Sequence, residues 1–205
     1  MNDGDSVTAR RGRLKLVLLA TTVAAPLVLA YALFYSGWRP ASYANHGELV
    51  QPPRLLRDVE FVDLDGKAFK LSSLRGKWLY VYFGSSRCGE RCLNNLHKTR
   101  QVIIAQEKNM DRVQRLFVLT DADALGALPD KLKDHRGLYL ARAAAAALQA
   151  MARDFTVPAG DPRAGLERVY LVDPLGNLMM SYPAEADPSG MRKDLARLLR
   201  VSRVG

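Results

Sequence analysis

The chain has 205 residues, of which 48% are apolar and 25% charged, a composition typical of a globular protein rather than a disordered one. Its formal charge of +9 would by itself allow nucleic acid, an anionic membrane or an acidic protein as partner. The sequence has no long basic run and no basic strip interleaved with aromatic residues, so we expect no nucleic-acid partner.

The first element is an uncharged apolar segment, residues 16–36, which follows a basic cluster. The cluster consists of Arg10, Arg11, Arg13 and Lys15. About twenty helical residues at about 1.5 Å each match a hydrocarbon core of about 30 Å, and Pro26 is tolerated in such a helix. Positive residues stay on the cytoplasmic side. The sequence therefore predicts a cytoplasmic N-terminus over 1–15, a single-pass helix over 16–36 in the cytoplasmic (inner) membrane, and the rest of the chain in the periplasm.

A cleaved signal peptide is the alternative for this segment, because Ala30-Tyr31-Ala32 resembles an A-x-A cleavage site. The aromatic residues near the end of the segment favour a retained anchor, since such rings prefer the membrane interface. Both interpretations place the following residues outside the cytoplasm. Residues 37–56, with three prolines and no periodicity, are expected to form a linker.

Residues 57–205 show strands alternating with helices. A hairpin is predicted over 59–71, and further strands over 78–83, 113–120, 137–140, 168–172 and 178–182. Helices are predicted from Cys88 to Ile104 and over 125–134, 143–155 and 189–201. This order indicates an α/β domain with a mixed central sheet flanked by helices. Asp121 and Asp123, which follow a strand, are expected to cap the next helix rather than to bind a cation.

Cys88 and Cys92 are the two cysteines of the chain, and they lie where a buried strand passes into a helix. In open α/β sheets this junction is where sites form. Unpaired N–H groups and the positive end of the helix dipole stabilise a thiolate there. We expect Cys88 to be the more exposed, attacking thiolate and Cys92 to be the resolving thiol. The pair can exchange disulfides, hold Cu(I), or form a static structural disulfide.

The stretch FGSSRCGERCLNNL, residues 83–96, resembles the F-G-x-[ST]-x-C-x-[DE]-x-C-x-x-x-L signature of the Sco/SenC proteins. The segment VYLVDPLGNLMMSYP, residues 169–183, resembles their Y-L-x-D-P-x-G hairpin. The resemblance implies a thioredoxin fold, copper binding through Cys88 and Cys92, and a role in assembling the binuclear copper centre of cytochrome c oxidase. The implied partner is the oxidase subunit carrying that centre, or another copper or thiol assembly factor.

The sequence departs from that family at the distal histidine, which should lie about five residues before Tyr170. Gly165 stands there, preceded by Ala164, and Gly89 replaces the usual proline after the first cysteine. The remaining candidate donors are His46, His97, His135, Met179 and Met180, and none is expected to complete a site. Since Cu(I) tolerates two thiolates whereas Cu(II) prefers nitrogen ligands, thiol exchange or transient Cu(I) handling is favoured.

Two other functions stay open. The first is a general periplasmic thiol-disulfide oxidoreductase or a peroxidase, for which Ser85, three residues before Cys88, gives a weak match to a Thr-x-x-Cys pattern. The second is a non-catalytic binding module in which the disulfide is only structural.

Overall fold

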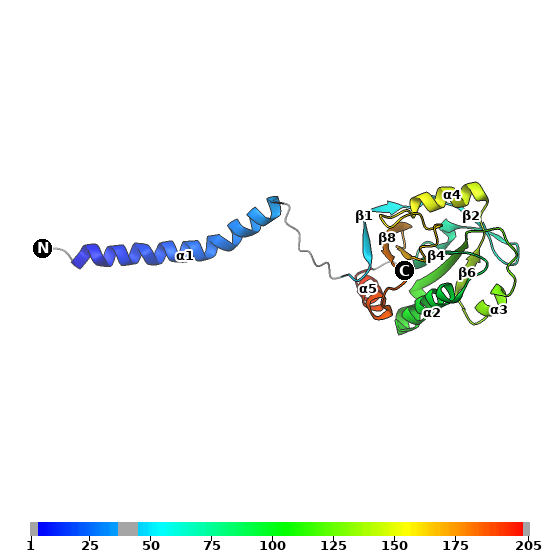
Figure 1. The fold of residues 1–205 in the computed structure, drawn as a ribbon. Helices are drawn as coiled ribbons and strands as arrows, with labels where there is room; N and C mark the ends of the chain where they lie inside the picture. Colours follow the sequence, from blue (N-terminus) through cyan, green and yellow to red (C-terminus); the bar gives the residue numbers. More distant parts are fainter. Residues whose placement is uncertain (1–3, 37–44, 203–205) are drawn as a thin grey trace. The chain divides into compact units, whose positions relative to one another are not determined.

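The computed structural model describes residues 4–36 and 45–202, in two units divided after Tyr43. The first unit contains the helix α1, Gly4–Tyr35, which continues through Pro26 (Figure 1). Within it, Lys15–Tyr35 is long and apolar enough to cross a membrane. The N-terminal apolar helix expected from the sequence is therefore present.

The second unit is built on a six-stranded sheet with the order β1-β8-β7-β4-β5-β6. Its strands are β1 (Glu48–Leu55), β4 (Trp78–Gly84), β5 (Val113–Leu119), β6 (Leu138–Ala141), β7 (Val169–Val172) and β8 (Asn177–Tyr182). The pairs β4–β5 and β5–β6 are parallel, and the other pairs are antiparallel. A separate hairpin joins β2 (Glu60–Val62) to β3 (Ala68–Lys70). The sheet is therefore mixed, as the sequence predicted.

Helices lie on both faces of the sheet (Figure 1), and an apolar core fills each side. On one face lie α2 (Glu90–Ile104), α3 (Leu128–Leu132) and α5 (Pro188–Val201). On the other lie α4 (Ala145–Asp154) and the β2–β3 hairpin. The 3₁₀ turns η1 and η2 span Leu71–Leu74 and Glu107–Arg112. Residues Trp78 to Phe83 of β4 are all buried, because alternate side chains enter the two cores.

The expectation of a linker over 37–56 was wrong for its second half; residues 37–44 lie outside the described residues. Residues 48–55 form β1, which pairs with β8 at the edge of the sheet, with a register shift between Leu49 and Arg54. Pro52 and Pro53 lie within that shift, and an edge strand accepts prolines because one side of it needs no partner. The second unit thus includes residues before 57. The helix predicted over 125–134 is also shorter, since α3 covers only Leu128–Leu132.

Candidate functional site

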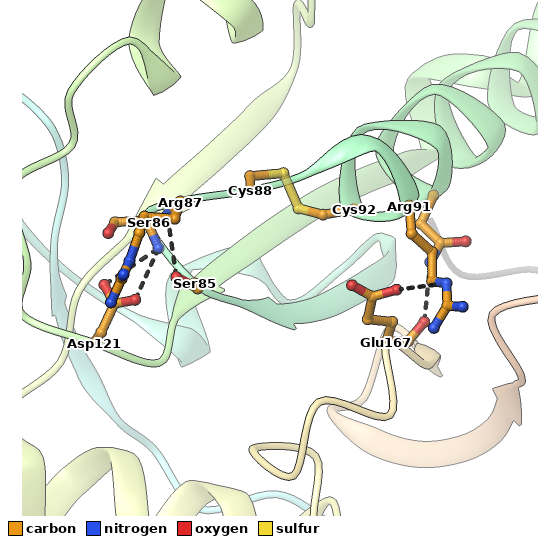
Figure 2. Close-up of a disulfide and its surroundings, with 9 residues drawn as sticks. Ser85, Ser86, Arg87, Cys88, Arg91, Cys92, Asp121 and Glu167 are labelled. Carbon is orange, nitrogen blue, oxygen red and sulfur yellow. Dashed lines mark hydrogen bonds and ion pairs between the residues drawn. A yellow bond between two sulfur atoms is a disulfide. The ribbon is translucent and has the colours of Figure 1, made fainter.

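Cys88 and Cys92 form a disulfide at the start of α2, with Cα atoms 5.3 Å apart (Figure 2). The preceding strand β4 ends at Gly84, and the Cys88 N–H closes a turn onto the Ser85 carbonyl at 3.1 Å. Gly89 begins the helix, and no side chain caps it. The chain therefore passes from a fully buried strand through a tight turn to a helix start whose first N–H groups have no side-chain acceptor.

The two cysteines are equally buried, each with 3% of its surface exposed. The expectation that Cys88 is more exposed than Cys92 was wrong. Both residues belong to an apolar cluster that also contains Tyr82, Leu96 and Leu128. Leu128 of α3 and the turn that carries Cys88 line a shared hollow of about 240 Å³, so this turn has a neighbour that local sequence does not reveal.

Asp121, just after β5, holds the turn that precedes the cysteines. Its carboxylate accepts the Ser86 N–H at 3.2 and 3.0 Å, and Figure 2 shows it facing the backbone of Ser86. Burial would raise the pKa of Asp121, but hydrogen bonds from Ser85 and Ser86 outweigh it and lower that pKa. The expected helix-capping role was wrong for both Asp121 and Asp123, because the next helix, α3, begins after Ala127 and has no side-chain cap. The contact between Asp121 and Ser86 could have been inferred from the sheet, because the parallel strands β4 and β5 end at the same edge.

A cleft of about 250 Å³ opens beside the disulfide. Both cysteines line it together with the loop before β7, which contributes Pro162, Arg163, Gly165 and Glu167. Asn95 of α2 donates to the Glu167 carbonyl at 3.0 Å, and Arg91 Nε lies 3.4 Å from Glu167 Oε2. Tyr82 also lines the cleft, and burial and then the charge of Glu167 raise the pKa of its phenol. The loop before β7 is therefore held to α2 by Glu167, and it lines the cleft together with the two cysteines.

The position at which the Sco/SenC resemblance expects a histidine is occupied by Gly165, at the wall of this cleft. Its φ of +71° is a left-handed conformation that glycine adopts without strain. The residues lining the cleft include no histidine and no methionine. Within residues 4–36 and 45–202, no three His, Cys, Asp or Glu side chains are grouped so that they would hold a metal ion. The wall of the cleft therefore carries no imidazole at the position of Gly165.

The other candidate donors lie away from the cleft. The His46 ring Nδ1 is 3.2 Å from the buried carboxylate of Asp194 on α5. His97 and His135 line a separate open hollow on the outer side of α2. Burial and nearby arginine charges lower the pKa of His135. Met180 is buried, and Met179 packs against the same apolar core. None of these five residues is among those that line the cleft beside the cysteines.

Residues 78–202 match the family model described as "Transmembrane-like, thioredoxin-like, C-terminal domain". The chain is 29% identical over 93 residues to a "Putative copper-binding protein" of Stutzerimonas stutzeri, covering 45% of each. It is 28% identical over 121 residues to the mitochondrial "Protein SCO2 homolog" of Danio rerio, covering 57% of this chain and 43% of that protein. The chain thus spans less than half the length of these curated relatives.

The fold is similar to that of Bradyrhizobium japonicum ScoI with copper bound, with a TM-score of 0.56. Sequence identity is 23%, and the match covers 70% of this chain and 98% of that structure. At this identity the comparison shows the fold alone, which is thioredoxin-like. The chain belongs to the transmembrane-like, thioredoxin-like C-terminal domain family, and its resemblance to the Sco/SenC proteins is confirmed.

Proposed function

We propose that this chain is a membrane-anchored, Sco-like factor whose Cys88–Cys92 dithiol serves the assembly of the copper centre of cytochrome c oxidase. It would reduce the cysteines of the oxidase subunit, pass Cu(I) to them transiently, or do both. The observation that supports this proposal most is the disulfide at the start of α2, which forms one wall of a cleft. The relatives described as a putative copper-binding protein and a SCO2 homolog point to the same chemistry.

The thiol reaction needs only the two cysteines and a partner disulfide. In the reduced protein, the Cys88 thiolate attacks one sulfur of that disulfide, the partner's S–S bond breaks, and one partner thiolate leaves. The Cys92 thiolate then attacks Cys88 Sγ, which releases the second partner thiolate and closes the disulfide seen between Cys88 and Cys92. The partner gains two electrons and this chain loses two. The uncapped start of α2 favours the thiolate form that both steps require.

Copper, as cargo, would be held mainly by the same two sulfur atoms. Reduced Cys88, in the turn before α2, and Cys92, in its first turn, would offer two soft ligands, a set that suits Cu(I). The other lining groups of the cleft are hydroxyl, carboxylate and guanidinium groups, which do not supply the nitrogen ligands that Cu(II) prefers. The donor set therefore fits transient Cu(I) transfer better than retention of copper in both oxidation states.

The proposed location rests on α1. We propose that Lys15–Tyr35 spans the cytoplasmic membrane with the basic residues that precede it on the cytoplasmic side, so that the thioredoxin-like domain works in the periplasm. Disulfide chemistry is compatible with that compartment.

The decisive experiment titrates the reduced full-length protein in detergent with Cu(I) against a competing chelator, and measures the reduction potential of its disulfide. We expect one Cu(I) per chain, lost in Cys88→Ser and in Cys92→Ser. Serine is the matched control because it keeps the size of the side chain and removes only the soft ligand. A failure to bind Cu(I), with a potential too low for exchange with a protein disulfide, would contradict both parts of the proposal.

A second measurement separates oxidase assembly from general thiol exchange. In cells carrying the Cys88→Ser, Cys92→Ser double variant, we expect the copper content of cytochrome c oxidase to fall while the disulfide state of other periplasmic proteins stays unchanged. Normal oxidase copper together with altered disulfides elsewhere would instead identify a general oxidoreductase.

A further inference from the structure

We infer that the domain carries a second functional surface, a groove that binds anionic phospholipid headgroups at the end of the sheet remote from the cysteines. The groove has a volume of about 480 Å³ and lies among α2, η2 and the starts of β4, β5 and β6. We call it the basic groove. The residues that define it for this purpose are Lys77, Arg100, Arg136, Ile104, Met110 and Tyr139.

The charged residues that line the basic groove are mostly positive. Lys77, Arg100, Arg115 and Arg136 line it, and Asp111 is the one acidic residue among its lining residues. In the part of the chain that the structure describes, none of the salt bridges involves Lys77, Arg100 or Arg136. These three cations are therefore available to an external anion.

Arg115 shows that the positive charge is crowded. Its side chain is buried with 4% of the residue exposed, and it donates to the carbonyls of Leu96 and Arg136 at 3.2 and 2.8 Å. Burial and then the nearby charge of Arg100 lower the pKa of Arg115 to about 10. An anion placed against Arg100 would relieve this repulsion.

Large apolar side chains lie beside these cations and face solvent. Ile104 is 47% exposed, Met110 45% and Tyr139 39%. Basic residues interleaved with exposed apolar side chains are typical of surfaces that rest in the headgroup region of a bilayer. An acidic protein segment would also meet the charge, but α1 supplies a reason to favour lipid. A chain anchored through Lys15–Tyr35 keeps its domain at high local concentration near a bilayer, so a modest affinity suffices.

The position of the basic groove leaves the redox site open. Lys77 precedes the first residue of β4, whereas the turn to Cys88 follows its last residue, Gly84. Seven strand residues at about 3.3 Å separate the two ends by roughly 23 Å. A domain seated on lipid through the basic groove would hold the disulfide away from the headgroups, where a partner domain can reach it. This inference rests on the proposed membrane anchor, but not on copper binding or thiol exchange.

The test places the full-length protein, with its native disulfide intact, in nanodiscs. A fluorophore is attached through Met110→Cys, and its quenching by nitroxide-labelled lipid is compared in phosphatidylcholine discs with and without phosphatidylglycerol. We expect strong quenching only with phosphatidylglycerol, and its loss in about 0.5 M salt, where charge interactions are screened within a few ångströms. The matched label is Lys70→Cys on β3, exposed on the hairpin that covers the other face of the sheet, which should stay unquenched.

Charge reversal completes the test. Lys77→Glu, Arg100→Glu and Arg136→Glu together should abolish quenching at position 110. The same change in charge at Lys67, Lys70 and Arg153, three exposed residues outside the groove, should leave it unchanged. Quenching that is equal in neutral and anionic discs, or absent from both, would overturn the inference. If the labels at position 110 of two chains lie close together, the groove binds a second copy of the chain and the inference is overturned. If an acidic protein binds the groove and phosphatidylglycerol does not displace it, the inference would be overturned in favour of a protein partner.

Discussion

Asp121 and Ser86 join the ends of two adjacent parallel strands: the carboxylate after β5 accepts the N–H of the residue two positions before Cys88, at 3.2 and 3.0 Å. The contact fixes the turn between β4 and α2, and with it the place of the first cysteine. The disulfide is therefore positioned by a neighbouring strand as well as by its own helix.

Replacing Asp121 should destabilise the domain and loosen the turn. We expect Asp121→Ala to lower the free energy of unfolding by about 1–3 kcal/mol at pH 7, because a buried N–H loses its acceptor. Asp123→Asn is the control, since Asp123 is 56% exposed and its ion pair with Arg87 contributes little. Denaturant unfolding measures both. An equal effect of the two substitutions would contradict the role of Asp121.

The same contact predicts a pH dependence. The pKa of Asp121 is lowered in the folded protein, so its ionised form stabilises the fold at pH values above the unfolded pKa of about 3.9. That contribution is lost as the pH falls through the lowered folded value. The difference in unfolding free energy between wild type and Asp121→Asn should therefore shrink between about pH 4 and pH 2. A difference that grows on acidification would show that the assigned sign is wrong.

Reduction of the disulfide should cost little stability. Cys88 and Cys92 are four positions apart, so the bond closes a very short loop and removes little entropy from the unfolded chain. We expect reduction to lower the unfolding free energy by about 2 kcal/mol or less. Guanidinium unfolding with and without a phosphine reductant measures this. The Cys88→Ser, Cys92→Ser variant should not respond to the reductant, and a much larger loss in the wild type would favour a structural disulfide.

Restoring a histidine at the cleft should change the oxidation state of copper that the protein retains. We expect Gly165→His to bind Cu(II) with a thiolate-to-copper absorption band that the wild type lacks. The φ of +71° at this position makes any side chain strained, and the cost should be about 1–2 kcal/mol. Gly137→His is the matched control, because Gly137 has a φ of +72°, also in open space, but does not line the cysteine cleft. A band in the control variant would contradict the assignment.

Truncation should show that β1 belongs to the folded domain. A chain that starts at residue 57 lacks Glu48, which pairs with the buried guanidinium of Arg168, and His46 and Gly47, whose N–H groups bind the buried Asp194. We expect it to be less stable than a chain starting at residue 45 by about 3 kcal/mol or more, because two buried charges lose partners. Equal melting temperatures would restore the linker interpretation of 48–56.

The sequence predicted the parts of this domain whose residues are patterned locally. Trp78 to Phe83 is an uninterrupted apolar run because it is buried on both faces, and each later strand and helix was found near its observed place. It did not predict β1, because an edge strand carries few buried side chains and two prolines mask it. The burial of Cys88 and the contact of Asp121 were missed for another reason. Cys88 shares its apolar cluster with Leu128 of α3, and Asp121 binds Ser86 from the turn after β4. Only the assembled sheet brings these distant parts of the sequence together.

The equal burial of the two sulfur-bearing residues has a kinetic consequence. With 3% of each cysteine exposed, any attacking group collides with the sulfur atoms rarely, and a protein that docks at the cleft would compensate by remaining bound beside them. The reduced dithiol would then be oxidised slowly by dissolved oxidants and quickly by the disulfide of a docked partner. Selectivity of this kind comes from docking, and two thioredoxin-like proteins with the same potential can differ in it widely.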